Sequence, residues 1–94
     1  MNISSAAIGH RLHVAIVHEG RIQHRVREMS GAWTPWGTIE APQGHEFDAI
    51  SCSCVDDCLH IVVKNVNGVY FHAIRFPDGS WQGLAQIPGQ PLLQ

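Results

Sequence analysis

Residues 20–39 read GRIQHRVREMSGAWTPWGTI, and 48 residues further along the chain reads GVYFHAIRFPDGSWQGLAQI (68–87). The two stretches share two glycines, a histidine, an arginine, a tryptophan and an isoleucine at matching positions. The segment before them repeats too, because ISSAAIGHRLHVAIVHE (3–19) aligns with ISCSCVDDCLHIVVKNV (50–66) at a separation of 47 residues. The chain therefore consists of two copies of one unit, with one residue inserted near Asn67.

Each copy predicts four short strands. In the second copy we expect them at residues 49–55, 58–64, 69–76 and 81–87, with turns at 56–57, 67–68 and 77–80. Asn67-Gly68 indicates a two-residue hairpin because both residues tolerate a positive φ. The first copy places its turns at Glu19-Gly20 and Ser30-Gly31. No stretch of ten or more residues has helical periodicity, so the sequence predicts an all-β fold.

Four antiparallel strands repeating at this interval are typical of the blades of a β-propeller. Residues 12–17 and 59–63 are apolar on both faces, as expected of strands lying between neighbouring blades. We predict one unit of two blades, covering about residues 2–42 and about residues 49–90. Two blades cannot close a ring and would leave apolar faces exposed. The expected partner is therefore the chain itself, in a cyclic homo-oligomer, with a trimer favoured and a tetramer as the alternative.

The composition is that of a small folded domain. Of the 94 residues, 45% are hydrophobic and 15% are charged, and the net charge of −2 gives no basic footprint for nucleic acid. No run approaches the length of a membrane span. The N-terminus lacks the basic start and apolar run of a signal peptide, and three crowded cysteines are expected as reduced thiols. We predict a cytoplasmic chain as synthesised, with non-classical export left open.

One pattern points to a known family. It reads RLHV at residues 11–14, GRIQHR at 20–25 and GAWTPWGTI at 31–39. This pattern resembles the blade repeat of the PLL-like bacterial β-propeller lectins, and it is similar to tectonin and tachylectin propellers. The resemblance implies a non-catalytic lectin without cofactors that binds sugars, such as fucosylated or methylated glycans, between adjacent blades. The family carries an aromatic residue before the repeat's histidine, where this chain has Gln23 and Phe71, and its odd number of blades cannot be built from two-blade chains.

The tryptophans are the first candidate ligand-binding residues. Trp33 and Trp81 are expected to open the fourth strand of each copy, and their recurrence favours a role in the fold over stacking on a sugar. Trp36 has Leu84 as its counterpart, so the fold needs this indole less. If only one kind of cleft binds a ligand, Trp36 is the residue that we expect there.

Histidines and arginines complete the candidate set. His24 and His72 lie in the third strands, where His72 shares its face with Tyr70, and either sugar binding or a hydrogen bond to a neighbouring strand would suit them. Arg27 and Arg75 recur near the ends of these strands and are candidates for sugar oxygens, with solvated strand ends as the alternative. The histidines inside the second strands, at positions 13 and 60, are expected to make structural hydrogen bonds.

Other functions find less support. The chain has no nucleophile elbow, phosphate loop or metalloprotease motif, so we do not expect an enzyme. The cysteines at 52, 54 and 58 with His60 do not have zinc-finger spacing, and the first copy has Ser5, Ala7 and Arg11 at the cysteine positions, so we expect no metal. The alternative function is a structural or protein-interaction ring, natural or designed, without sugar binding.

Overall fold

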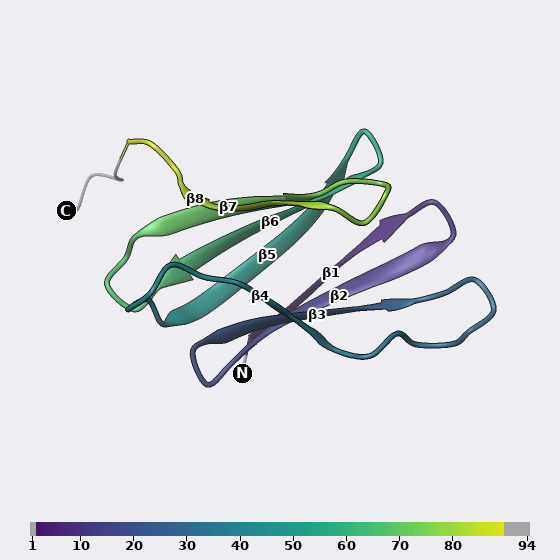
Figure 1. The fold of residues 1–94 in the computed structure, drawn as a ribbon, viewed down its shortest axis with the longest axis horizontal. Coiled ribbons are helices and arrows are strands. Elements are labelled where there is room, and N and C mark those ends of the chain that lie inside the picture. Colours follow the sequence, from purple (N-terminus) through teal and green to yellow (C-terminus); the bar gives the residue numbers. More distant parts are fainter. Residues whose placement is uncertain (1, 90–94) are drawn as a thin grey trace.

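The computed structural model describes residues 2–89 and folds them into two antiparallel four-stranded sheets (Figure 1). Sheet 1 contains β1 (Asn2–Ile8), β2 (Arg11–His18), β3 (Arg21–Arg27) and β4 (Gly37–Ile39). Sheet 2 contains β5 (Phe47–Val55), β6 (Cys58–Asn65), β7 (Tyr70–Arg75) and β8 (Trp81–Gln86). Each strand pairs with the next in chain order, which confirms the predicted all-β chain of two repeated sheets.

The two sheets approach one another most closely along their first strands, β1 and β5 (Figure 1). Two side chains of β1 join them by accepting hydrogen bonds from β5. Asn2 Oδ1 accepts from the Ile50 N–H at 3.1 Å, and Ser4 Oγ accepts from the Cys52 N–H at 3.0 Å. The small side chains on these strands allow the backbones to come this close.

One hydrophobic core lies between the sheets. It draws on one face of each sheet and contains Ala15, Val17, Ile22, Phe47, Ile50, Leu59, Ile61, Val63 and Phe71. The alternation of a strand sends neighbouring residues to opposite faces, so only every second residue of β2 and β6 enters this core. We call the face of each sheet that contributes to this core its packed face, and the opposite face of the same sheet its open face. The open faces are apolar too, and Leu12 on β2 is 37% exposed, so within residues 2–89 only one face of each sheet is covered by the other sheet.

The turns after the third strands repeat in detail. In sheet 1 the Gly31 N–H donates to the Glu28 carbonyl at 2.9 Å, and in sheet 2 the Gly79 N–H donates to the Phe76 carbonyl at 2.9 Å. Both glycines have positive φ, at 95° and 89°. The copies therefore share loop geometry as well as strand order.

The hairpin between β6 and β7 differs from the predicted two-residue turn. Only Gly68 takes a positive φ, of 83°, while the Asn65 N–H donates to the Val69 carbonyl across a three-residue loop. The buried Asn65 side chain explains this, because its Oδ1 accepts from the N–H groups of both Asn67 and Val69. The two-residue prediction was wrong because it ignored that side chain.

Trp81 opens β8 as predicted, but Trp33 does not open the fourth strand of sheet 1. β4 begins only at Gly37, and Trp33 makes an isolated bridge to Arg27. Thr34 interrupts the regular ladder, since its N–H donates to the Val26 carbonyl at 2.8 Å while its hydroxyl accepts from the Val26 N–H at 2.9 Å. Pro35 follows it and has no N–H to continue the pairing.

Candidate functional site

Two equivalent histidine pairs connect the second and third strands. In sheet 1, His13 Nδ1 lies 2.9 Å from His24 Nε2, with the rings stacked 5.1 Å apart at 21°. In sheet 2, His60 Nδ1 lies 2.8 Å from His72 Nε2, with the rings 5.0 Å apart at 18°. Such a bond needs one ring to donate and the other to accept. The predicted structural role of the second-strand histidines is therefore present, and their partners are the candidate sugar-binding histidines.

Burial favours the neutral form of three of these rings, those of His13, His24 and His72. Burial, followed by the nearby His13 and the Arg75 guanidinium, lowers the pKa of His24 from 6.5 to about 4. Burial also lowers the pKa of His13, with Arg75 and Arg11 adding to the effect and Glu28 opposing it. The pKa of His72 is lowered by burial and then by His60. Neutral rings preserve the donor–acceptor bond, which double protonation would replace with two opposed N–H groups.

Trp81 reaches across from sheet 2 to His24 of sheet 1. The ring centroids lie 5.5 Å apart at 85°, an edge-to-face contact. Trp81 nevertheless keeps 37% of its surface exposed. This tryptophan therefore belongs to the contact between the sheets, as the prediction of a role in the fold required, while its outer edge remains accessible.

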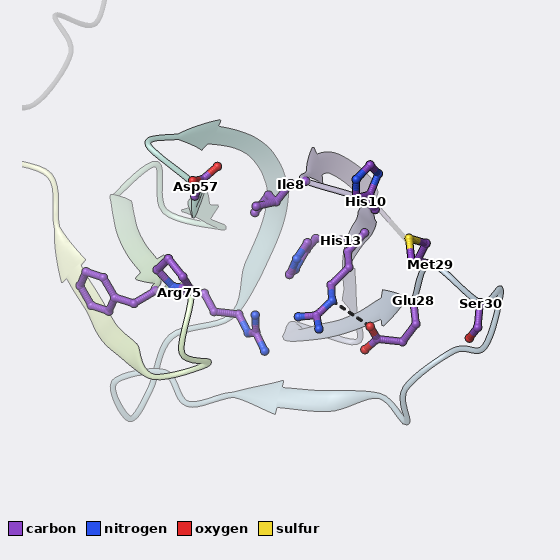
Figure 2. A pocket seen from close by; sticks show the side chains of 12 residues that line it. Ile8, His10, His13, Glu28, Met29, Ser30, Asp57 and Arg75 are labelled. Carbon is purple, nitrogen blue, oxygen red and sulfur yellow. Dashed lines mark ion pairs between the residues drawn. The ribbon is translucent and has the colours of Figure 1, made fainter.

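A cleft of about 640 Å³, lined by both charged and apolar side chains, opens beside this contact (Figure 2). Its sheet 1 wall includes His13 and an ion pair in which Arg11 Nε lies 2.8 Å from Glu28 Oε2. Arg75 extends from the sheet 2 side toward His13, and within residues 2–89 it forms no ion pair (Figure 2). The cleft therefore offers one unpaired guanidinium to a polar ligand.

A second hollow lies on the open face of sheet 1. Its volume is about 410 Å³, and we call it the Trp33/Trp36 hollow, lined by Ile3, Val14, Ile16, Arg25, Trp33 and Trp36. The Arg25 guanidinium carbon lies 5.2 Å from the centre of the Trp33 ring and 5.0 Å from that of Trp36. Arg25 Nε also donates to the Thr34 carbonyl at 3.0 Å. The guanidinium is thus fixed beside two indoles that are 45% and 41% exposed.

Sequence reasoning missed Arg25. The available signal was strand alternation, which puts Arg25 on the face of β3 opposite to His24, next to the turn that carries both tryptophans. The sequence predicts that the chain returns beside β3 after this turn, but not that Trp33 and Trp36 both contact Arg25. That contact depends on the Thr34–Val26 hydrogen bonds rather than on a regular ladder.

The predicted site residues fall into separate places rather than one site. Trp33 and Trp36 meet around Arg25, and Trp81 meets His24. Arg27 and Arg75 lie under the glycines of their turns, with a guanidinium nitrogen 3.2 Å from a Cβ built on Gly31 and 3.4 Å from one built on Gly79. Tyr70 and His72 lie on the open face of sheet 2, half-buried, as their alternation with the packed Phe71 requires.

The three cysteines are free thiols, and burial raises the pKa of the Cys52 thiol while a hydrogen bond with Ser4 lowers it. In the part of the chain that the structure describes, no three or more His, Cys, Asp or Glu side chains are grouped to hold a metal ion. The same residues include no helix with the length and apolar character to cross a membrane.

Comparisons with protein-family models, curated proteins and solved structures found no match to this chain.

Proposed function

We propose that this chain is a subunit of a closed β-propeller that binds carbohydrate, without catalysis, in the clefts between blades. The observation that carries the proposal is the Trp33/Trp36 hollow, where two exposed indoles flank a fixed arginine. Each sheet serves as one blade, and three chains forming six blades is the favoured ring, with four chains as the alternative.

The chemistry of the hollow suits a sugar. Indole faces pack against the C–H faces of a pyranose, and such contacts combine large apolar area with defined geometry. The Arg25 guanidinium, oriented by Thr34, offers its remaining N–H groups to sugar oxygens at the rim. The exposed indoles of Trp33 and Trp36 favour a ligand with an apolar edge, such as the methylated or deoxy sugars expected from the family resemblance.

Assembly would multiply this affinity. A ring presents one such hollow per chain, and a glycan surface that engages several at once gains through effective concentration without new contacts. The cleft at Arg75 would supply a second type of interblade site, with an ion pair in its wall in place of the indoles. A weak single site is therefore sufficient for the proposed function.

A glycan array at high protein density, followed by calorimetry on the best ligand, tests this proposal. Trp36→Ala should weaken binding at least tenfold, about 1.4 kcal/mol, because it removes one side of the hollow. The matched control is Leu84→Ala, which truncates the counterpart of Trp36 in the other copy and should bind as the unmodified chain does.

Two outcomes would contradict the proposal. The first is silence across fucosylated, methylated and amino sugars, which would favour a structural or protein-interaction ring. The second is unchanged sugar binding by a Trp36→Ala variant whose far-UV circular dichroism shows the native fold.

A further inference from the structure

The two open faces correspond, position by position, to the two faces that are already packed together. On the open face of sheet 2 lie His60, Val62, Lys64, Tyr70, His72 and Ile74. Their counterparts in the first copy, at separations of 47 and 48 residues, are His13, Ala15, Val17, Ile22, His24 and Val26, which form the packed face of sheet 1. The open face of sheet 2 is thus the equivalent of the packed face of sheet 1, which sheet 2 covers.

The same correspondence holds for the covering surface. The packed face of sheet 2 presents Trp81, and the open face of sheet 1 presents Trp33 at the equivalent position. The residues under these tryptophans also correspond, since Ile61 and Val63 of the packed core match Val14 and Ile16 in the floor of the Trp33/Trp36 hollow. The contact between the two sheets joins two kinds of face, and each molecule has a second face of each kind that is uncovered. These are the open face of sheet 2 and the open face of sheet 1.

The histidine pairs of the two sheets have the same geometry but different coverage. The pair His60–His72 has nearly the same bond length, ring distance and ring angle as the pair His13–His24. His24 is covered by Trp81, whereas no tryptophan among residues 2–89 lies against His72. The His72 ring is therefore oriented to pack against an indole, as His24 does, but no indole within residues 2–89 of the same chain contacts it.

We propose that a second copy of this chain supplies that indole, so that Trp33 of the partner subunit lies on His72 as Trp81 lies on His24. This inference rests on the proposed ring and specifies how its subunits join. The contact is head-to-tail, with the open face of sheet 2 on one copy covered by the open face of sheet 1 on the next. The first strands join in the same register, with Ser51 accepting from the backbone N–H of the partner's Ser5 as Ser4 accepts from that of Cys52.

This arrangement also completes a cleft from two chains. The Trp33/Trp36 hollow of one copy becomes one wall, and the strand that carries Tyr70 and His72 of the neighbour becomes the other. Trp81 keeps 37% of its surface exposed inside the internal contact, so an indole at this position can pack on a histidine and still line a cleft. Trp36, which has no tryptophan counterpart at the internal contact, would distinguish this junction from it.

A head-to-tail contact uses two different faces, and this makes it separable by mutation. Val62→Arg blocks the open face of sheet 2, and Val14→Arg blocks the open face of sheet 1, because both residues are half-buried at the centre of their faces. Val66→Arg is the matched control, since Val66 is 54% exposed in the β6–β7 loop, outside both faces. Masses are measured by size-exclusion chromatography with light scattering.

We expect the unmodified chain and Val66→Arg to form the same closed assembly, and each face variant alone to run as a monomer of 10.4 kDa. An equimolar mixture of the two face variants should form a complex of two chains and no larger, because each retains the face that the other has lost. A mixture that stays monomeric, or a face variant that keeps the full assembly, would overturn the proposed contact. If the arginine variants do not fold, Val62→Ser and Val14→Ser take the same test as graded losses of assembly.

The assembly measurements and the glycan measurements can fail independently of each other. A native assembly that ignores every glycan would overturn the lectin and leave the contact standing. A chain that binds glycan through Trp36 but assembles through other faces would overturn the contact alone.

Discussion

His24 shows how a single side chain is controlled from three sides. Its ring bonds to His13 on the neighbouring strand, is covered by Trp81 from the other sheet, and lies in the field of Arg75. All of these surroundings favour the neutral imidazole, so the residue couples the packing of the sheets to pH.

We predict that the chain loses stability as the pH falls from about 6.5 to about 4. The folded-state pKa of His24 is about 4, below its ordinary value of 6.5, so the unfolded chain takes up the proton first and is favoured on acidification. The contribution is complete above pH 6.5, and after allowance for solvent screening it amounts to roughly 2–3 kcal/mol. Urea unfolding at several pH values measures it.

Two variants check this assignment. His24→Gln keeps a hydrogen-bonding side chain that does not titrate, so its stability should depend less on pH over this range. The exposed His10→Gln should follow the profile of the unmodified chain. An unchanged slope in His24→Gln would show that another group is responsible.

At the scale of elements, the turns after the third strands position both the tryptophans and the arginines. The turn glycines Gly31 and Gly79 take the left-handed conformation, and the guanidinium of Arg27 or Arg75 lies close against each of them. The strand ends that follow differ, because Thr34 and Pro35 delay β4 while β8 starts directly at Trp81. The two equivalent turns thus place their tryptophans differently. Trp81 packs on His24 between the sheets, and Trp33 lies on the open face of sheet 1.

Gly79→Ala should destabilise the fold by about 1–2 kcal/mol, because φ is 89° there and an L side chain is strained in that conformation. Gly83→Ala is the matched control in the following strand, where a Cβ has nothing within 4 Å and φ is not positive. Chemical denaturation of both variants measures the difference. Equal stability of the two would mean that the turn relaxes without cost.

Across the whole of residues 2–89 there is one buried apolar core, and neither sheet has a core of its own. The buried cluster is shared, with Ala15, Val17 and Ile22 from sheet 1 facing Leu59 and its neighbours from sheet 2. Removing either sheet would expose the packed face of the other, and a single sheet with one uncovered apolar face has little independent stability.

The two sheets should therefore unfold in one transition. The variant Trp81→Phe leaves Trp33 and Trp36 as fluorescence reporters of sheet 1, while far-UV circular dichroism reports both sheets. In urea, at one protein concentration, the two signals should have the same midpoint. Separate midpoints would show that the sheets are independent units.

The repeat, the number and order of the strands, and the face on which each residue of a strand lies can all be predicted from the sequence. These features are local, because a strand alternates with a period of two and its turns depend on a few residues of known conformational preference. Thus the placement of His24 on one face of β3, with Gln23 and Arg25 on the other, follows from the strand period alone. The loop at 66–68 escaped prediction because it depends on the side chain of Asn65 reaching two N–H groups beyond its own strand.

Three features are visible only in the folded chain: which histidines pair, the position of Arg25 beside Trp33 and Trp36, and which face of each sheet is covered by the other. The two copies have similar apolar patterns on both faces, so the pattern alone does not show that Trp81 packs on His24 while Trp33 and His72 stay uncovered. Which faces are covered depends on chain connectivity. A chain of two sheets buries one face of each sheet against the other, and it has no further sheet to cover the two open faces.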